Sequence, residues 1–113
     1  MKIVVPVQNN TPESKVSLTF ARSPWFALWE KQSGAVDFIA NPYRQEKIGV
    51  GSRIFELLIT ENEANTLLAY ELGLKVQQLA VKNKIQLIII NNRNQTLSDI
   101  LQLSEQKKKD GES

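Results

Sequence analysis

The sequence contains neither cysteine nor histidine among its 113 residues. The chain therefore forms no disulfide and offers a metal neither thiolate nor imidazole, which excludes the usual zinc and iron–sulfur sites. Catalytic triads that need a Cys nucleophile or a His base are excluded on the same ground. We accordingly expect no metal site built from the chain's own side chains.

Long hydrophobic runs and dense basic stretches are also absent. No segment approaches the ~20 apolar residues of a membrane helix, and the apolar start over residues 1–7 is too short for a signal peptide. The formal net charge is only +2, and the arginines are scattered rather than interleaved with aromatics. We expect a cytoplasmic protein with neither nucleic acid nor membrane as a partner.

The chain is expected to form one α/β domain over residues 1–106. No repeat, linker or low-complexity segment divides it, and a chain of this length buries roughly 65% of its unfolded surface, enough for one core. Residues 107–113, Lys-Lys-Lys-Asp-Gly-Glu-Ser, are polar and predict a disordered tail.

Five apolar segments predict strands. Residues 3–7 are a continuous β-branched run, typical of a strand covered on both faces. Residues 25–31 and 35–40 alternate in polarity around the turn Gln32-Ser33-Gly34, which predicts a hairpin. Residues 65–70 are predicted to be another buried strand, and residues 85–90 the most strongly buried strand of all.

Three segments predict helices. The first follows Gly49-Val50-Gly51, with Ser52 as its N-cap, and ends near Asn62. The second spans about residues 72–83, and the third begins at the capping sequence Thr96-Leu97-Ser98-Asp99 and ends at about residue 106. Alternating strands and helices in the second half imply parallel pairing. We predict a five-stranded mixed sheet, order 3-2-1-4-5 with strand 2 antiparallel, and helices on both faces.

Several short motifs occur in the order found in one known family. They are Met1-Lys2-Ile3-Val4-Val5-Pro6-Val7 with Asn9-Asn10, then Ser14-Lys15-Val16-Ser17, Phe20-Ala21-Arg22-Ser23-Pro24-Trp25-Phe26, Phe38-Ile39-Ala40-Asn41-Pro42, Gly49-x-Gly51 and Glu56-Leu57-Leu58. Over about residues 1–103 the chain thereby resembles the dinitrogenase iron–molybdenum cofactor-binding domain family, the NifX-like group. The resemblance implies a ribonuclease H-like fold and an accessory role in handling an iron–molybdenum or related cluster.

Two positions depart from the family's usual pattern. Thr19 stands where the family usually has histidine, and Ala21 where it has glycine. That histidine is the family's usual candidate ligand for the cluster, and soft metals prefer thiolate or imidazole. We therefore expect no direct cluster ligation by this chain, and its cofactor is left unknown.

The predicted topology brings several loops to the carboxyl edge of the sheet, where open α/β sheets bind ligands. Arg44 and Asn92 are expected beside one shallow cationic crevice. Gly49 and Gly51 would permit close backbone approach, and the free N–H groups that begin the following helix favour an anion. The predicted ligand-binding residues are Asn9, Arg22, Asn41, Gly49, Gly51, Ser52 and Arg93.

Simpler structural roles are alternatives for the same residues. Asn41-Pro42 can terminate a strand, and Gly-x-Gly can serve a tight loop. Arg22 can pair with a carboxylate, for which Glu30, Glu46 and Glu71 are the candidates. Trp25 and Trp29 share one strand face, either buried under a helix or exposed for stacking bases.

The favoured hypothesis is a non-catalytic accessory domain that binds a small anion or an anionic metal cofactor at this edge. The alternative is a protein–protein interaction module that has lost the cluster ligand. An enzyme is not expected, because no acid–base or nucleophile constellation is present and the predicted central strands lack the carboxylates of a two-metal nuclease. The chain is expected to be a monomer or a weak homo-oligomer.

Overall fold

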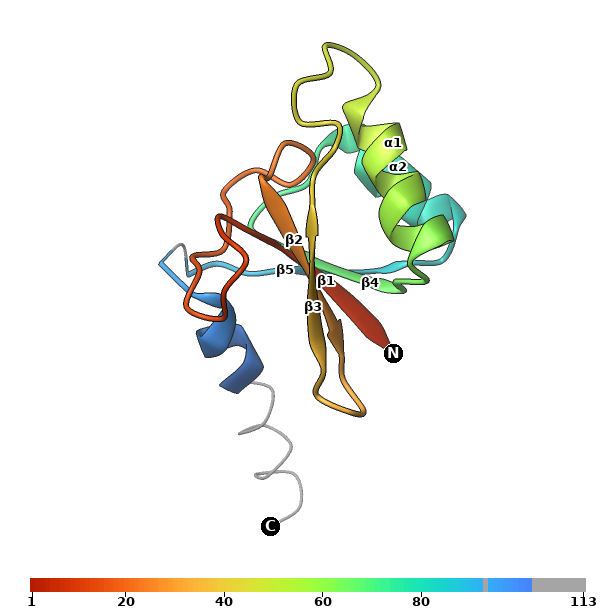
Figure 1. The fold of residues 1–113 in the computed structure, drawn as a ribbon. Coiled ribbons are helices and arrows are strands. Elements are labelled where there is room, and N and C mark those ends of the chain that lie inside the picture. The colour runs from red at the N-terminus through yellow and green to blue at the C-terminus, as the bar shows by residue number, and fades with distance from the viewer. Residues whose placement is uncertain (93, 103–113) are drawn as a thin grey trace.

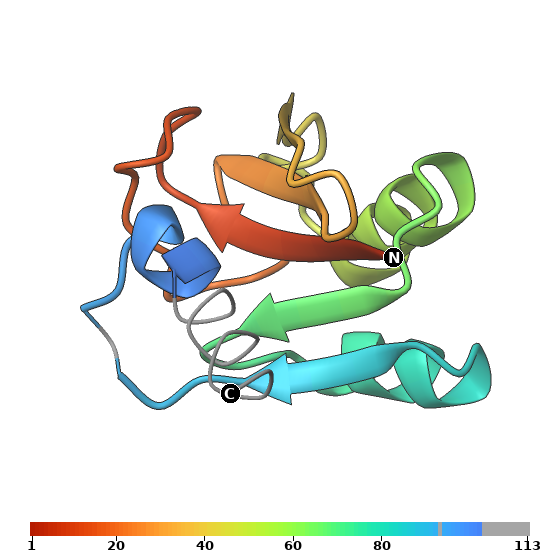
Figure 2. The same ribbon diagram turned by 90° about the horizontal axis from the view of Figure 1, so that it is seen from below.

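The computed structural model describes residues 1–92 and 94–102. A mixed sheet with the strand order β3-β2-β1-β4-β5 forms its centre, as predicted (Figure 2). β1 (Lys2–Val7) pairs antiparallel with β2 (Trp25–Glu30), which in turn pairs antiparallel with β3 (Val36–Ala40). The residues of β1 from Ile3 to Val7 are all buried. The β-branched run thus forms the central strand, while the ribonuclease H-like designation stays a prediction.

The other side of β1 carries the parallel half of the sheet. β4 (Thr66–Ala69) pairs parallel with β1, and β5 (Gln86–Ile89) pairs parallel with β4. The carboxyl ends of β1, β3, β4 and β5 therefore point toward the same edge of the sheet, as expected. β5 corrects one expectation: it lies at the predicted edge of the sheet, but it is not the most strongly buried strand, because its first and last residues are exposed. An apolar run fits an edge strand and a central strand equally well, because hydrophobic periodicity does not reveal how many neighbouring strands a strand has.

The predicted hairpin turn joins β2 to β3. Gly34 takes a φ of +79°, which side chains other than hydrogen rarely allow. Its N–H donates to the carbonyl of Glu30 at 2.8 Å, and the N–H of Glu30 donates to the carbonyl of Ala35 at 2.9 Å. Local turn chemistry thus determines the register of this pair.

Two helical segments cover one face of the sheet (Figure 1). α1 (Val50–Phe55) continues without a break into a π-helix, η1 (Glu56–Glu61), and α2 (Leu74–Lys82) packs beside α1. Ile54 and Leu58 are fully buried against the strands. The prediction that Ser52 caps the first helix is wrong. Gly49 is the N-cap, because its left-handed backbone starts the helix three residues before Ser52. No side chain provides a capping hydrogen bond.

Residues 97–102 form the helix on the opposite face (Figure 1). The predicted capping sequence is confirmed: the N–H of Thr96 donates to the Asp99 carboxylate at 3.0 Å, and the N–H of Asp99 donates to the Thr96 hydroxyl at 3.2 Å. Leu97 and Ile100 are buried in the core of this face. The predicted end of this helix and the predicted tail lie outside the described residues. Within the described ranges, no helix is long and apolar enough to cross a membrane.

Candidate functional site

Loop 18–24, between β1 and β2, is held by a buried hydroxyl network. Ser17 and Ser23 are 1% and 0% exposed, and their hydroxyl oxygens lie 2.7 Å apart. The Ser23 hydroxyl also lies within hydrogen-bond distance of the carbonyl oxygens of Val7, at 3.0 Å, and Trp25, at 2.8 Å. The network joins the end of β1 to the start of β2, so the backbone next to Arg22 has a defined position.

Asn41 joins this loop to loop 41–49, which follows β3. Its side-chain N–H groups donate to the carbonyls of Ala21, at 2.8 Å, and Ser23, at 2.9 Å. Its side-chain oxygen accepts the N–H of Tyr43 at 2.9 Å. The Asn41 amide is thus engaged by backbone groups, which is the geometry of a loop-joining residue rather than of a direct ligand contact.

The side chains of Arg22 and Arg53 both contact loop 41–49, which itself carries Arg44, and we call these three arginines the arginine cluster. The guanidinium group of Arg22 donates to the carbonyl of Arg44 at 2.9 Å. The guanidinium carbon of Arg53, on α1, lies 5.7 Å from the centre of the Tyr43 ring, within cation–π range. All three arginines are exposed. Their charges therefore lie on the surface, where a ligand can reach them.

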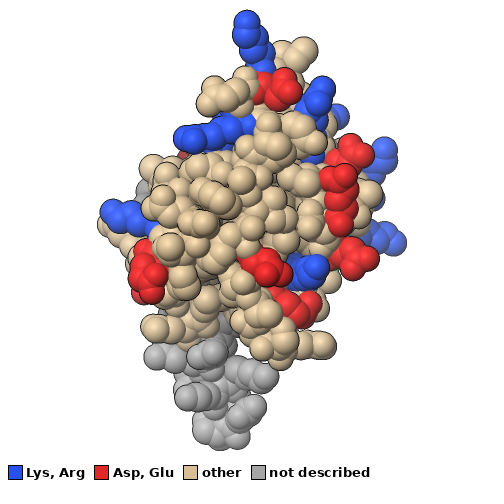
Figure 3. Space-filling model, viewed as in Figure 1, with Lys and Arg blue, Asp and Glu red and all other residues tan. Residues whose placement is uncertain are grey.

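The charge around the arginine cluster is predominantly positive. Loop 41–49 adds one further cation, Lys47, and one carboxylate, Glu46. Figure 3 shows this end of the molecule, uppermost in the view, with blue atoms outnumbering red. Glu30 forms an ion pair with the N-terminal ammonium rather than with Arg22. The arginine cluster therefore offers an excess of positive charge to an anion.

The two glycines before and in α1 have different structural roles. Gly49 has a φ of +74° and no atom within 4 Å of the place where a Cβ would lie. Gly51 lies against α2, because a Cβ there would be 3.3 Å from Val76 Cγ2. The first glycine begins a helix and the second lets two helices approach. This geometry favours the tight-loop alternative for Gly-x-Gly.

Asn9 and Asn92 lie in a different group of loops. The N–H of Asn9 donates to the Ser14 hydroxyl at 2.7 Å, and the N–H of Leu97 donates to the Ser14 carbonyl at 2.9 Å. The side-chain oxygen of Asn92 accepts the N–H of Asn94 at 3.2 Å. No hydrogen bond within residues 1–92 and 94–102 joins this group to Arg22, and Arg93 lies outside the described residues. The expected single crevice that joins Asn9 and Arg93 to Arg22 thus stays a prediction.

The two tryptophans of β2 belong to the core rather than to an exposed stacking surface. Trp29 is 7% exposed within the cluster of the face covered by residues 97–102, and Trp25 packs partly buried against the same cluster. The buried alternative therefore holds for Trp29 and, in part, for Trp25.

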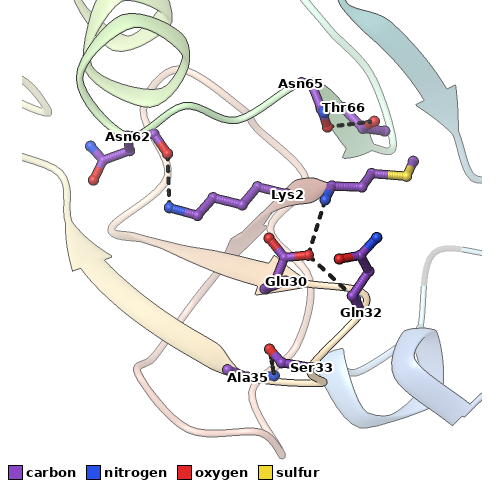
Figure 4. A network of polar contacts seen from close by, with 9 residues as sticks. Lys2, Glu30, Gln32, Ser33, Ala35, Asn62, Asn65 and Thr66 are labelled. Carbon is purple, nitrogen blue, oxygen red and sulfur yellow. Dashed lines mark hydrogen bonds and ion pairs between the residues drawn. The ribbon is translucent and has the colours of Figure 1, made fainter.

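The N-terminal edge of the sheet carries a separate polar network (Figure 4). The N-terminal ammonium of Met1 donates to the Glu30 carboxylate at 3.0 Å, and the N–H of Gln32 donates to the same oxygen at 3.3 Å. The ammonium hydrogen bond, followed by that of Gln32, lowers the pKa of Glu30 below its ordinary value. Lys2 donates across to the carbonyl of Asn62 at 3.1 Å. This network lies at the start of β1, whereas the arginine cluster lies beyond the end of β3.

Sequence reasoning identified Arg22 and Arg44 but missed Tyr43 and Arg53 as members of the site. Tyr43 and Arg53 are ten positions apart, and only the path of loop 41–49 brings the guanidinium over the ring. The one available signal was the spacing of arginines on both sides of Gly49-Val50-Gly51. That spacing does not indicate where the arginine side chains point.

Comparisons with known proteins identify the family. A model of the family described as "Dinitrogenase iron-molybdenum cofactor" matches residues 1–107. The apo form of the orange protein from Desulfovibrio gigas is similar in fold, with a TM-score of 0.79 and 18% identity over 94% of this chain and 88% of that one. A putative NifB protein from Thermotoga gives a TM-score of 0.77 and 18% identity over 93% and 87%. No curated protein matches. Because the family model covers nearly the whole sequence, the chain belongs to the dinitrogenase iron–molybdenum cofactor family.

Proposed function

We propose that this protein is a non-catalytic accessory protein that binds a small anion, or an anionic metal cofactor, at the arginine cluster. The observation that carries the proposal is the contact of Arg22 and Arg53 with loop 41–49, which carries Arg44, with no ion pair from these arginines to a carboxylate among the described residues. An anion bound at this loop would be attracted by the positive charges of these arginines. Membership of a cofactor-binding family supports an accessory binding role.

The residues of the arginine cluster can bind the outer surface of an anion, but they do not fit direct ligation of a metal cluster. The chain has neither thiolate nor imidazole, which are the ligands that soft metals prefer. In the described ranges no group of three or more carboxylates is placed to hold a metal ion. Each guanidinium group presents a planar set of N–H donors with a permanent charge. We therefore assign recognition to hydrogen bonding and charge.

The remaining predicted residues divide by their contacts. Asn41 supports the site as a positioning residue, because its amide holds loop 18–24 against loop 41–49. Ser52, exposed and adjacent to Arg53, can add a hydroxyl donor. Gly49 and Gly51 serve the geometry of α1. The proposal does not require Asn9 or Arg93.

Equilibrium dialysis against tetrathiomolybdate, with molybdenum measured by elemental analysis, tests the proposal. We expect saturable binding that weakens as salt increases, since exposed charges are screened. Arg22→Ala and Arg53→Ala should each weaken binding about fivefold, corresponding to roughly 1 kcal/mol for an exposed charge pair. Lys82→Ala is the matched control, because it removes an exposed cation from the far end of α2 and should bind like the wild type.

Two results would contradict the proposal. One is the absence of saturable binding by the wild type, and the other is equal binding by the wild type and both arginine variants. Purifying the protein from its native source distinguishes the proposed function from the alternative, a protein–protein interaction module. A stoichiometric protein partner together with no molybdenum or other bound anion would favour the interaction module, for which the absence of His and Cys is the supporting observation.

A further inference from the structure

β3 lies at the edge of the sheet opposite β5, with β2 on its inner side. Two hydrogen bonds at the ends of this pair show which backbone groups face β2. The N–H of Glu30 donates to the carbonyl of Ala35 at 2.9 Å, and the N–H of Asn41 donates to the carbonyl of Pro24 at 3.1 Å. Because backbone groups alternate in direction along an antiparallel strand, the odd-numbered residues of β3 bond to β2 and the even-numbered residues face outward.

The outward-facing residues are Val36, Phe38 and Ala40. Within residues 1–92 and 94–102, no further strand or loop supplies hydrogen bonds to their N–H and C=O groups. Proteins commonly protect such an edge with lysine, proline or a β-bulge. β3 contains neither lysine nor proline, its pairing with β2 is continuous, and its one charged residue is Asp37. The backbone of β3 is therefore able to pair with another strand.

We infer that this edge pairs with β3 of a second copy of the chain, antiparallel and about a two-fold axis at Phe38. The inference is independent of the proposed function. In this register Phe38 pairs with Phe38 of the second copy, and Val36 pairs with Ala40 of the second copy. All three outward residues then form hydrogen-bonded pairs, each of which exchanges two backbone bonds. A two-fold contact needs a self-complementary surface, and a strand edge that is symmetric about its central residue provides one.

The side chains of β3 favour this register over its neighbours. Phe38 is half-buried against the core of the face covered by residues 97–102, so the two rings would meet across the axis as an aromatic cross-strand pair. Asp37 is exposed on the other face and would lie opposite Ile39 of the second copy. A register centred on Asp37 would instead place two carboxylates opposite each other and leave Ala40 unpaired. Charge and hydrogen bonding thus select the same axis.

Two further considerations define the occupant and its affinity. Residues 103–113 contain no β-branched or aromatic residue, so their composition makes them a poor strand to fill this edge. A pair of five-residue strands is small beside the roughly 1,200–2,000 Å² that stable interfaces bury, so we expect a weak, rapidly exchanging dimer.

Amide NMR of the full chain, diluted from about 1 mM to about 20 μM, tests the pairing. The N–H resonances of Val36, Phe38 and Ala40 should shift with concentration, whereas those of Asp37 and Ile39, which donate to β2, should shift much less. In the dilute sample the three outward amides should exchange rapidly with solvent. Their protection there would show that another segment of the same chain covers the edge, which would overturn the inference.

A proline substitution at the edge removes one outward donor. Ala40→Pro deletes an N–H that does not face β2, a position where an edge strand tolerates proline. It should weaken self-association about tenfold or more in sedimentation equilibrium, as the loss of two symmetry-related hydrogen bonds implies. Ala40→Ser is the matched control, because it keeps the N–H and should associate like the wild type. Equal association of the two variants, or a wild type that is monomeric at the highest concentration, would contradict the inference.

Disulfide cross-linking tests the register, since the chain has no cysteine of its own. Position 37 of one copy lies opposite position 39 of the other, with Cα atoms about 4.5 Å apart, whereas two copies of position 37 are about 8 Å apart and beyond disulfide reach. A mixture of Asp37→Cys and Ile39→Cys chains should therefore cross-link under diamide about tenfold faster than either variant alone. Equal rates, or no cross-link in the mixture, would overturn the register. The proline and serine variants keep the test decisive if Ile39→Cys does not fold.

Discussion

Replacing Ser23 by alanine should cost much more stability than its small size suggests. The change removes a hydroxyl that is 0% exposed and lies within hydrogen-bond distance of Ser17 and of the carbonyls of Val7 and Trp25. The lost hydrogen bonding contributes about 1 kcal/mol net, and leaving the buried Ser17 hydroxyl without its partner adds about 1–3 kcal/mol. We expect a total loss of about 3 kcal/mol in the free energy of unfolding.

A double-mutant cycle separates these two contributions. Ser17→Ala alone should cost about 1 kcal/mol, because Ser23 keeps its carbonyl partners. In the Ser23→Ala background the same Ser17→Ala change should be neutral or stabilising, since it removes the unpaired hydroxyl. The cycle is suited to groups in direct contact, whose effects are not additive.

Thermal and urea unfolding followed by circular dichroism measure the cycle. At about 2.1 cal/mol/K of unfolding entropy per residue, a loss of 3 kcal/mol lowers the Tm by roughly 12 °C. Ser52→Ala is the control, because that serine is exposed and provides no capping hydrogen bond, so its effect should stay within about 0.5 kcal/mol. The reasoning fails if Ser17→Ala costs the same in both backgrounds, or if Ser23→Ala is no worse than the control.

Two further predictions concern the backbone of Gly49 and the N-terminal network. Gly49→Ala should lower the free energy of unfolding by about 1 kcal/mol, because φ is +74° although the space around a Cβ is open; an unchanged urea midpoint would contradict this. Because the ammonium hydrogen bond lowers the pKa of Glu30, its stabilising effect is complete above the ordinary Glu pKa and is lost as pH falls through the lowered value. The Tm difference between wild type and Glu30→Gln should therefore shrink on acidification, and a constant difference would disprove the linkage.

Much of the sheet could be predicted because each signal is local. The buried run of β1, the turn at Gly34 and the reciprocal hydrogen bonds of Thr96 and Asp99 all depend on residues a few positions apart. The strand order followed from these elements, because parallel strands need crossover connections and a hairpin places its strands side by side.

The candidate site was predictable only in outline. The sequence indicated a cationic end containing Arg22, but not that Arg53 would lie over Tyr43. Asn41 and Gly51 illustrate the reason: each fits a ligand contact and a packing role equally well until the neighbouring backbone or helix is in place. Contacts between distant segments depend on the final path of the loops, which no short pattern encodes.

The sequence by itself determined the class of fold, the absence of soft metal ligands and the starts of individual elements, since these depend on residue chemistry and on periodicity over a few positions. Only the tertiary structure decided that both ends of β5 are exposed and that the side chains of Arg22 and Arg53 contact loop 41–49. Those features depend on how many neighbours an element has and on which side chains pack between them. Such properties belong to the assembled chain, because hydrophobic burial is non-directional and specifies that a residue is covered without specifying by what.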